Sequence, residues 1–268
     1  MANFNNKVVV ITGGSDGIGK ALVEQFLTLG AKVATCGRTT EKLRILAEQL
    51  PTQNLYIQTV DVAKQADCES FVQQVIAKWG GIDILINNAG ISMRALVSEV
   101  SIETLKNVMD INFWGTVYTT KAALNSVMEK KGVIVGVSSI AGYRGLPGRS
   151  GYSASKYALN GWLEALKTEL YPSGTHVMWV CPGFTTSNIR NAALDKDAKA
   201  QGESPMDEGA MMSSEECATH IIHAIEKRER TLVLTFTGKR TVFMNKFFPK
   251  WADKLAYHFF FKNGKLVK

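Results

Sequence analysis

The sequence predicts a single doubly wound α/β domain, in which a parallel sheet of seven strands is covered by helices on both faces. Seven short, apolar and β-branched runs recur along the chain, as is typical of strands that are buried on both faces. Helix-length segments alternate with these runs, which implies right-handed crossover connections. A length of 268 residues is sufficient for one domain of this kind with a full core.

The strands are expected, in chain order, at residues 7–12, 32–36, 55–60, 82–86, 133–137, 176–180 and 232–235. The helices between them are expected at 17–29, 40–50, 65–79, 102–129, 151–171 and 214–227. Two segments interrupt the alternation. Residues 188–213 are polar and predict a lid over a pocket, and residues 238–268 form a basic, aromatic-rich extension. We therefore expect a cofactor-binding and catalytic domain over 1–237 and a separate extension over 238–268.

Composition excludes several classes of protein. The four cysteines are far apart and form no CxxC pair, so neither a disulfide framework nor a zinc site is expected, and a reducing, cytoplasmic compartment is favoured. No secretory signal precedes the first strand and no apolar run reaches 18 residues. His220 and His223 lack a third ligand at a recognised spacing, so no metal is expected.

The net charge of +7 is concentrated near the end of the chain. Residues 226–268 hold eleven Lys/Arg and three Asp/Glu, a balance of +8, whereas the other 225 residues carry −1. The body of the protein therefore gives no reason to expect a nucleic acid partner.

A glycine-rich turn follows the first strand, with the sequence Thr12-Gly13-Gly14-Ser15-Asp16-Gly17-Ile18-Gly19. Free N–H groups at a helix N-terminus attract phosphate, and glycine allows the backbone to approach it closely. The GxxxGxG spacing at the start of a helix therefore predicts a dinucleotide site. The alternative is a tight strand–helix turn that binds no ligand.

The end of the second strand indicates which dinucleotide binds. NAD sites usually place an acid there for the ribose hydroxyls, but this chain reads Cys36-Gly37-Arg38-Thr39. The guanidinium of Arg38 can hold a 2′-phosphate through several donors, so the sequence favours NADP(H). The alternative is that Arg38 only caps or solvates the helix that follows.

Ser139, Tyr152 and Lys156 form a candidate catalytic set. Tyr152 and Lys156 are four residues apart, so a helix places them on one face. An ammonium beside a phenol lowers the phenol pKa by favouring the phenolate. At ~4 Å this interaction is worth about 1 kcal/mol in water and about 4 kcal/mol at an effective dielectric of 20, so the effect depends on a dry site. Tyr152 would exchange the proton of a carbonyl reduction, and Ser139 would hold the substrate oxygen. The alternative is that Tyr152 and Lys156, taken by themselves, are an ordinary pair of neighbours on a helix surface.

These motifs, in this order and spacing, resemble the short-chain dehydrogenase/reductase family in its single-domain form, over residues 7 to about 235. The matching positions are the glycine turn at 12–19, Asp61-Val62, Asn87-Asn88-Ala89-Gly90, Asn112, Ser139, Tyr152, Lys156 and Pro182-Gly183. The resemblance implies a Rossmann-type fold and an oxidoreductase activity. The stretches 138–156 and 211–234 most resemble the hydroxysteroid- and retinol-type branch.

The resemblance also implies a role for each matching residue. The phosphates of the cofactor would be held by Gly13, Ser15, Gly17, Ile18 and Gly19. Adenine would be contacted by Asp61 and Val62, and the cofactor would be bordered by Asn88, Ala89 and Gly90. The carboxamide would be met by Pro182, Gly183 and Ser187. Lys156 would also bind the nicotinamide ribose beside Tyr152. Asn112 would order a water in a proton relay.

The expected activity is hydride transfer between NADP(H) and a ketone or secondary alcohol that is more apolar than charged. The resemblance further implies a homo-dimer or homo-tetramer formed through the two long helices. Pocket walls are expected from 188–213 and from residues near Arg144–Arg149, where no spacing rule reveals the substrate. Two alternatives are a non-catalytic NADP(H)-binding module that senses redox state and a membrane-docked scaffold.

The extension is expected to contain an amphipathic helix over 247–261. Trp251, Leu255 and Phe259 recur at intervals of four, and Lys246, Lys250 and Lys254 form an adjacent stripe. Basic residues beside exposed aromatics suggest peripheral contact of 243–261 with an anionic membrane. Packing of this helix on the body of the protein or on a partner subunit is slightly favoured, because a large apolar patch more often marks a protein contact.

Overall fold

A computed structural model describes residues 4–202 and 211–267. Its main sheet has seven parallel strands in the order β3-β2-β1-β4-β5-β6-β7, which confirms the expected doubly wound fold. The strands are β1 (Val8–Thr12), β2 (Lys32–Gly37), β3 (Leu55–Thr59), β4 (Ile84–Asn87), β5 (Val133–Val137), β6 (His176–Cys181) and β7 (Thr231–Val233). The strand order reverses between β1 and β4, and ligands of such sheets bind at that point.

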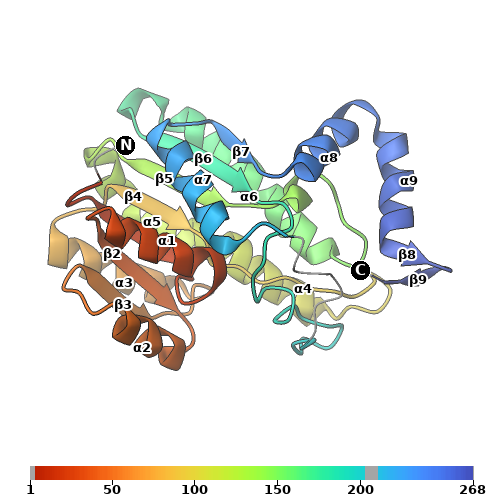
Figure 1. Cartoon of the computed structure of the whole chain (residues 1–268), viewed down its shortest axis with the longest axis horizontal. Helices are drawn as coiled ribbons and strands as arrows, with labels where there is room; N and C mark the ends of the chain where they lie inside the picture. The colour runs from red at the N-terminus through yellow and green to blue at the C-terminus, as the bar shows by residue number, and fades with distance from the viewer. Residues whose placement is uncertain (1–3, 203–210, 268) are drawn as a thin grey trace.

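Helices cover both faces of the sheet (Figure 1). They are α1 (Gly17–Thr28), α2 (Thr40–Gln49), α3 (Gln65–Trp79), α4 (Ile102–Met109), α5 (Gly115–Glu129), α6 (Ser150–Glu169) and α7 (Ser214–Glu226). Alternate residues of β1 enter the two cores: Val9 and Ile11 pack with α1 and α7, whereas Val8 and Val10 pack with α3, α5 and α6. This alternation is why each strand reads as a continuous apolar run.

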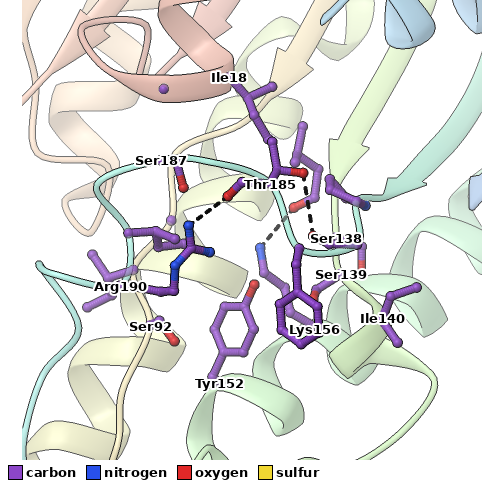
Figure 2. A pocket seen from close by; sticks show the side chains of 18 of the residues that line it. Ile18, Ser92, Ser138, Ser139, Ile140, Tyr152, Lys156, Thr185, Ser187 and Arg190 are labelled. Carbon is purple, nitrogen blue, oxygen red and sulfur yellow. Dashed lines mark hydrogen bonds between the residues drawn. The ribbon is translucent and has the colours of Figure 1, made fainter. Parts of the chain in front are cut away.

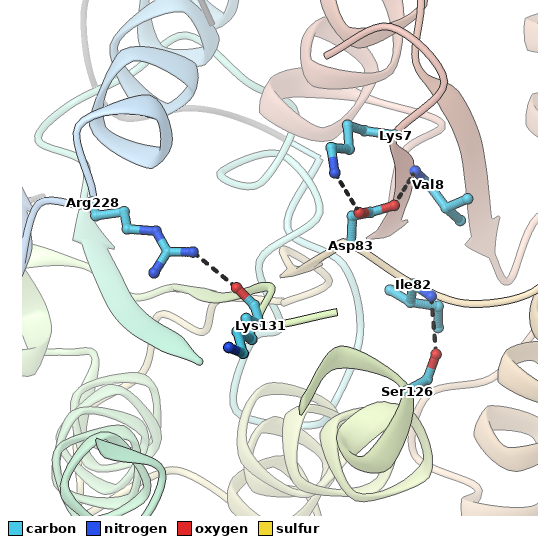
Figure 3. A network of polar contacts seen from close by, with 7 residues as sticks. All are labelled: Lys7, Val8, Ile82, Asp83, Ser126, Lys131 and Arg228. Carbon is cyan, nitrogen blue, oxygen red and sulfur yellow. Dashed lines mark hydrogen bonds and ion pairs between the residues drawn. The ribbon is translucent and has the colours of Figure 1, made fainter. Parts of the chain in front are cut away.

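Polar contacts fix the edge of the sheet at which the strands begin (Figure 3). The Asp83 carboxylate accepts from the Lys7 ammonium and from the Val8 amide, at 2.9 Å each. The Ser126 hydroxyl of α5 accepts from the Ile82 amide at 2.9 Å. These contacts hold β1 and β4 in register, so the switch point at their other end is fixed as well.

The helix expected over 102–129 is present but is interrupted by a π-helical turn at Asp110–Trp114. Asn112 lies in this turn and is fully buried. An extra residue in one helical turn rotates the following side chains, and such turns often occur at functional sites. The periodicity of the sequence gave no sign of the interruption.

The last part of the chain differs most from expectation. Strand β7 ends at Val233, and Thr235 caps a helix that the sequence did not predict, α8 (Phe236–Phe247). Its apolar residues follow no single helical face, so periodicity could not reveal it. The expected helix over 247–261 is present as α9 (Pro249–Phe260), and a hairpin of β8 (Phe261–Lys262) and β9 (Lys265–Leu266) follows.

Helices α8 and α9 extend beyond β7 at the side of the domain (Figure 1). Arg144 ties them to the loop before α6, because its guanidinium donates to Asn245 at 3.1 Å and to Asp253 at 2.7 Å. Stacking of Phe184 on Phe259, with ring centroids 6.1 Å apart, adds a second tie. No helix in the described part of the chain is both long and apolar enough to cross a bilayer.

Candidate active site

One cavity of about 660 Å³ opens at the carboxyl ends of β1, β2, β4, β5 and β6. The turn that precedes α1 lines one end of it, and the N-terminal part of α6 lines the other. Helices α8 and α9 contribute Met244, Leu255, Phe259 and Phe260 to its wall. The expected lid is described at 188–202 and 211–213 only, since 203–210 lie outside the described residues; Asn188, Ile189 and Arg190 line the cavity.

The glycine turn has a shape that only glycine can adopt at several positions. Gly13 and Gly17 have φ values of 70° and 51°, which residues with a Cβ atom rarely adopt. A Cβ atom on Gly19 would lie 2.2 Å from the Gly13 carbonyl oxygen. Asp16 precedes α1 without capping it through its side chain, so the first amides of this helix have no side-chain acceptor there. They form a positive end beside the cavity.

Asn88 holds this turn against β4. Its side-chain amide donates to the carbonyl oxygens of Thr12 and Gly13, at 3.0 and 3.1 Å. The Thr12 hydroxyl accepts from the Asn88 and Ala89 amides in return, at 3.0 Å each. Asn88, Ala89 and Gly90 all line the cavity. The two loops at the switch point therefore form one hydrogen-bonded unit.

Arg38 is exposed at the end of β2 and lines the same cavity. Nearby, the Lys42 ammonium binds the Asp16 carboxylate at 2.6 Å, which compensates the negative charge in the glycine turn. Ser15 lies close to Gly37, where an added Cβ atom would be 3.2 Å from the Ser15 hydroxyl. Ser15 and Arg38 therefore both line the part of the cavity next to Gly37.

Asp61 is not among the cavity-lining residues, although its neighbours Val60 and Val62 are. Its carboxylate accepts from the Ala63 amide at 3.2 Å, and its own amide donates to the Asp67 carboxylate at 3.0 Å. In this conformation Asp61 shapes the loop that presents Val62.

Ser139, Tyr152 and Lys156 all line the cavity and meet at its inner end (Figure 2). Lys156 is 4% exposed, and its ammonium donates to the Val137 carbonyl oxygen at 2.8 Å. The same ammonium lies 5.7 Å from the centroid of the Tyr152 ring. Ser139 precedes a short 3₁₀ turn, Ile140–Gly142, and its hydroxyl accepts from the Ala141 amide at 3.1 Å.

Burial and neighbouring charges set the proton affinities at this end. Burial raises the pKa of Tyr152 above its ordinary value, while the Ser139 hydroxyl and the Arg149 and Arg190 guanidiniums act to lower it. Burial lowers the pKa of Lys156 to about 8. The Arg149 and Arg190 guanidiniums therefore add to the positive charge near Tyr152, where the Lys156 ammonium also lies.

Asn112 does not line the cavity. Its side chain accepts from the Ile91 amide at 2.8 Å and donates to the Ile91 carbonyl oxygen at 2.9 Å. It also donates to the Ser155 hydroxyl at 3.0 Å, and that hydroxyl donates to the Tyr152 carbonyl oxygen at 2.7 Å. Asn112 therefore joins the chain after β4 to the turn of α6 that carries Tyr152.

The loop after β6 closes the cavity over the candidate catalytic groups. Pro182, Gly183 and Ser187 line it as the sequence suggested. The loop also brings residues that sequence reasoning did not single out as a site: Arg190 points toward the opening above Tyr152, and its guanidinium donates to the Thr185 carbonyl oxygen at 2.9 Å (Figure 2). No motif spacing identifies such wall residues, because loop geometry alone brings them inward.

Comparison with known proteins agrees with this architecture. A family model described as short chain dehydrogenase matches residues 7–198. The chain is 32% identical to mouse (Mus musculus) dehydrogenase/reductase SDR family member 7B, covering 92% of this chain and 79% of that protein. It is 34% identical to Arabidopsis thaliana 11-beta-hydroxysteroid dehydrogenase-like 4A, covering 89% and 79%. These relatives agree with the expected hydroxysteroid-type branch.

Solved structures share the fold. A short-chain dehydrogenase from Streptomyces avermitilis superposes with a TM-score of 0.81 at 26% identity, covering 95% of this chain and 97% of that one. At lower identity, an alcohol dehydrogenase from Thermococcus sibiricus complexed with 5-hydroxy-NADP gives 0.74 (24% identity; 85% and 94% covered). A Burkholderia phymatum enzyme in complex with NAD gives 0.81 (22%; 94% and 96%). The fold by itself therefore does not select between the two cofactors.

Proposed function

The chain belongs to the short-chain dehydrogenase family, and from this premise we propose that it is an NADP(H)-dependent oxidoreductase that interconverts a ketone and a secondary alcohol. One observation carries the proposal. A single cavity joins a helix N-terminus suited to phosphate with a buried group of hydroxyl, phenol and ammonium. The first is what a dinucleotide needs, and the second is what proton transfer at a carbonyl needs.

The residues present fit a nicotinamide dinucleotide. The first amides of α1 face the cavity without a side-chain cap, and Gly13, Gly17 and Gly19 line it with backbone alone. Arg38 and Ser15 line the cavity beside Gly37, which itself carries no carboxylate, and they are proposed to hold a 2′-phosphate. Arg38 supports NADP(H) over NAD, since a guanidinium binds phosphate through several donors.

The bound nicotinamide supplies or accepts the hydride. In the reducing direction Tyr152 gives its hydroxyl proton to the substrate oxygen, and Ser139 donates a hydrogen bond to the same oxygen. Both groups lie on rigid elements, the start of α6 and the turn after β5. In the oxidising direction the phenolate takes the proton back.

Lys156 would hold the nicotinamide ribose and stabilise the phenolate of Tyr152. Its bond to the Val137 carbonyl oxygen fixes the ammonium 5.7 Å from the centroid of the Tyr152 ring. Asn112 positions the turn of α6 that carries Tyr152 and takes no part in the reaction itself, because its side-chain amide is already bonded to Ile91 and Ser155. In this proposal, a water bound near Asn112 and Lys156 takes part in a proton relay.

The substrate is proposed to have an apolar body. Aromatic and aliphatic side chains from the loop after β6 and from α8 and α9 form most of the outer wall, namely Phe184, Ile189, Met244, Leu255, Phe259 and Phe260. A panel of ketones tested by NADPH absorbance, and repeated with NADH, examines the function directly. Binding of NADPH without turnover of any ketone would favour the redox-sensing module instead.

A membrane contact is proposed for the corner between α8 and α9. The aromatic corner, which we define as Phe243, Phe247, Phe248 and Trp251, forms a chain of ring contacts with centroids 4.9 to 6.2 Å apart. All four rings are exposed, and Trp251 is 65% exposed. Lys246 and Lys250 flank them, so the corner combines an apolar tip with positive charge, as interfacial helices do.

Self-association is proposed through the long helices α5 and α6, with a homo-dimer or homo-tetramer as the product. Trp114, which immediately precedes α5, and Tyr157 of α6 are exposed aromatics on these elements. A reducing, cytoplasmic location with access to membranes is proposed as well, since all four cysteines are unpaired and buried.

A further inference from the structure

Arg149 is a buried cation inside the cavity. It immediately precedes α6, three residues before Tyr152, and its side chain lines the cavity. The residue is only 9% exposed. Its guanidinium carbon lies 5.6 Å from the centroid of the Phe260 ring of α9. The charged group is thus enclosed between the candidate catalytic helix and the extension.

No carboxylate of the described residues pairs with this guanidinium. Within residues 4–202 and 211–267, no ion pair or hydrogen bond joins the Arg149 side chain to another residue. The ionisable groups that act on it there are the Tyr152 phenol, which favours its charged form, and two further arginines, Arg94 and Arg190, which oppose that form. Burial lowers the pKa of Arg149 to about 10, so the group is still cationic at neutral pH. A buried charge without a partner is costly, and proteins keep one where a ligand supplies the partner.

The start of α6 adds to the same positive field. This helix has 20 residues, no acidic residue in its first turn and no side-chain cap. Its amides and macrodipole therefore reinforce the Arg149 charge at one point of the cavity. Arg144, in contrast, is already paired with Asp253 at 2.7 Å. Arg149 therefore presents its charge to the cavity without a carboxylate partner in the described part of the chain.

We propose that the substrate of this site carries a carboxylate on its apolar body, and that Arg149 binds this carboxylate. The inference rests on the proposed function and names the substrate class more closely, as an apolar oxo acid or hydroxy acid. A planar guanidinium matches a carboxylate through two parallel N–H donors. Leu146, Phe184 and Phe260 line the remainder of this region, which suits an alkyl chain.

The position of Arg149 also limits where the carboxylate lies in the substrate. Arg149 immediately precedes α6, and its guanidinium acts on the Tyr152 phenol inside the same cavity. A carboxylate bound by Arg149 and a carbonyl at Tyr152 are therefore expected to be separated by only a few bonds. A 4-oxo acid such as 4-oxodecanoate meets this requirement, and its methyl ester is the matched neutral compound.

Binding can be tested apart from turnover. Isothermal titration calorimetry on the NADP⁺-loaded protein compares octanoate with octanamide, which have the same chain but differ in charge. The wild type is expected to bind octanoate at least about tenfold more tightly. Arg149→Gln should abolish this preference, Arg149→Lys should keep part of it, and Arg44→Gln, a surface control, should leave it unchanged. An unaltered affinity of Arg149→Gln for NADP⁺ shows that the variant is folded.

Three results would overturn the inference: equal wild-type affinities for octanoate and octanamide, a preference that survives in Arg149→Gln, or displacement of octanoate by inorganic phosphate at equal concentration. Kinetics give an independent measurement. Wild-type kcat/KM for 4-oxodecanoate should exceed that for its methyl ester about tenfold or more, and Arg149→Gln should remove the difference through KM. Arg149-dependent octanoate binding without any NADPH oxidation would contradict the oxidoreductase proposal but leave the carboxylate site standing.

Discussion

The ammonium of Lys156 lies 5.7 Å from the centroid of the Tyr152 ring and bonds the Val137 carbonyl oxygen at 2.8 Å. The two side chains come from successive turns of one helix, and both face the same cavity. Lys156 is thereby held against the sheet, and Tyr152 lies beside it in the pocket (Figure 2).

Replacing Tyr152 by phenylalanine removes the only proton that this side chain can give. We expect kcat for ketone reduction to fall by about 10²–10⁴, the usual contribution of a general acid, with NADPH affinity retained. Steady-state kinetics and a cofactor titration measure the two quantities. Tyr171→Phe is the matched control, because Tyr171 is 84% exposed. A Tyr152→Phe variant with wild-type kcat would refute the catalytic role.

Lys156→Met should make the protein more stable at neutral pH. The folded pKa of Lys156 lies near 8, below the ordinary 10.5. Its charged form therefore destabilises the fold below about pH 8, and this penalty disappears as pH rises from about 8 to above 10.5. The difference corresponds to roughly 3 kcal/mol, and loss of the bond to Val137 offsets part of it. We expect a net gain of about 1–2 kcal/mol at pH 7.

Chemical denaturation at pH 7 and pH 10 measures this effect. The stability advantage of Lys156→Met should be larger at pH 7 and should shrink at pH 10. Lys121→Met, at an exposed position of α5, should show no such dependence. An advantage that grows with pH would mean that Lys156 is not destabilised in its charged form.

Arg38→Gln should weaken NADPH selectively. A hydrogen bond to a charged partner contributes about 1.5–3 kcal/mol, so KM for NADPH should rise roughly 10- to 100-fold, while KM for NADH should hardly change. Initial rates measured with NADPH and with NADH give the two KM values to be compared. Arg44→Gln is the control, since Arg44 pairs with Glu41 and Glu48 on the surface of α2. A parallel loss with both cofactors would show that Arg38 does not contact a 2′-phosphate.

Gly183 is constrained by the start of the extension. A Cβ atom at this position would lie 2.3 Å from the Thr235 hydroxyl and 2.8 Å from its methyl group. Gly183→Ala should therefore destabilise the protein by about 1–3 kcal/mol, the range seen for overpacking, and Thr235→Ala should restore part of that loss. Gly161→Ala, in the interior of α6 where a Cβ meets nothing within 4 Å, should instead stabilise by up to about 1 kcal/mol. Thermal melts rank the stability of Gly183→Ala, of Gly183→Ala combined with Thr235→Ala, and of Gly161→Ala.

The aromatic corner should determine attachment to vesicles. We expect co-sedimentation with phosphatidylserine vesicles that decreases with added salt, and a loss of most binding in the double variant Phe247→Ser, Trp251→Ser. Tyr171→Ser removes an aromatic side chain that is even more exposed but lies elsewhere, and this variant should bind as the wild type does. Binding that persists in the double variant would move the contact away from this corner, and absence of any binding would remove the membrane proposal.

Local sequence patterns identified the main sheet and most of its helices. A buried parallel strand such as β1 must be apolar on both faces, so Val8–Thr12 reads as a strand without any tertiary information. The glycine turn and the Tyr152–Lys156 spacing are also local, because one strand end and one helix turn set their geometry. Helix α8 could not be predicted in this way, since its apolar residues follow no regular face.

The sequence by itself determined the fold, the family resemblance and the set of Ser139, Tyr152 and Lys156. Each of these depends on short residue spacings or on the order of strands and helices along the chain. Only the tertiary structure decided what surrounds those groups. It enclosed Arg149 under Phe260, bound Asn112 to Ile91 and Ser155, and brought α8 and α9 to the wall of the cavity. Burial and charge at a site are sums over residues distant in the chain, so they arise only when the chain has folded.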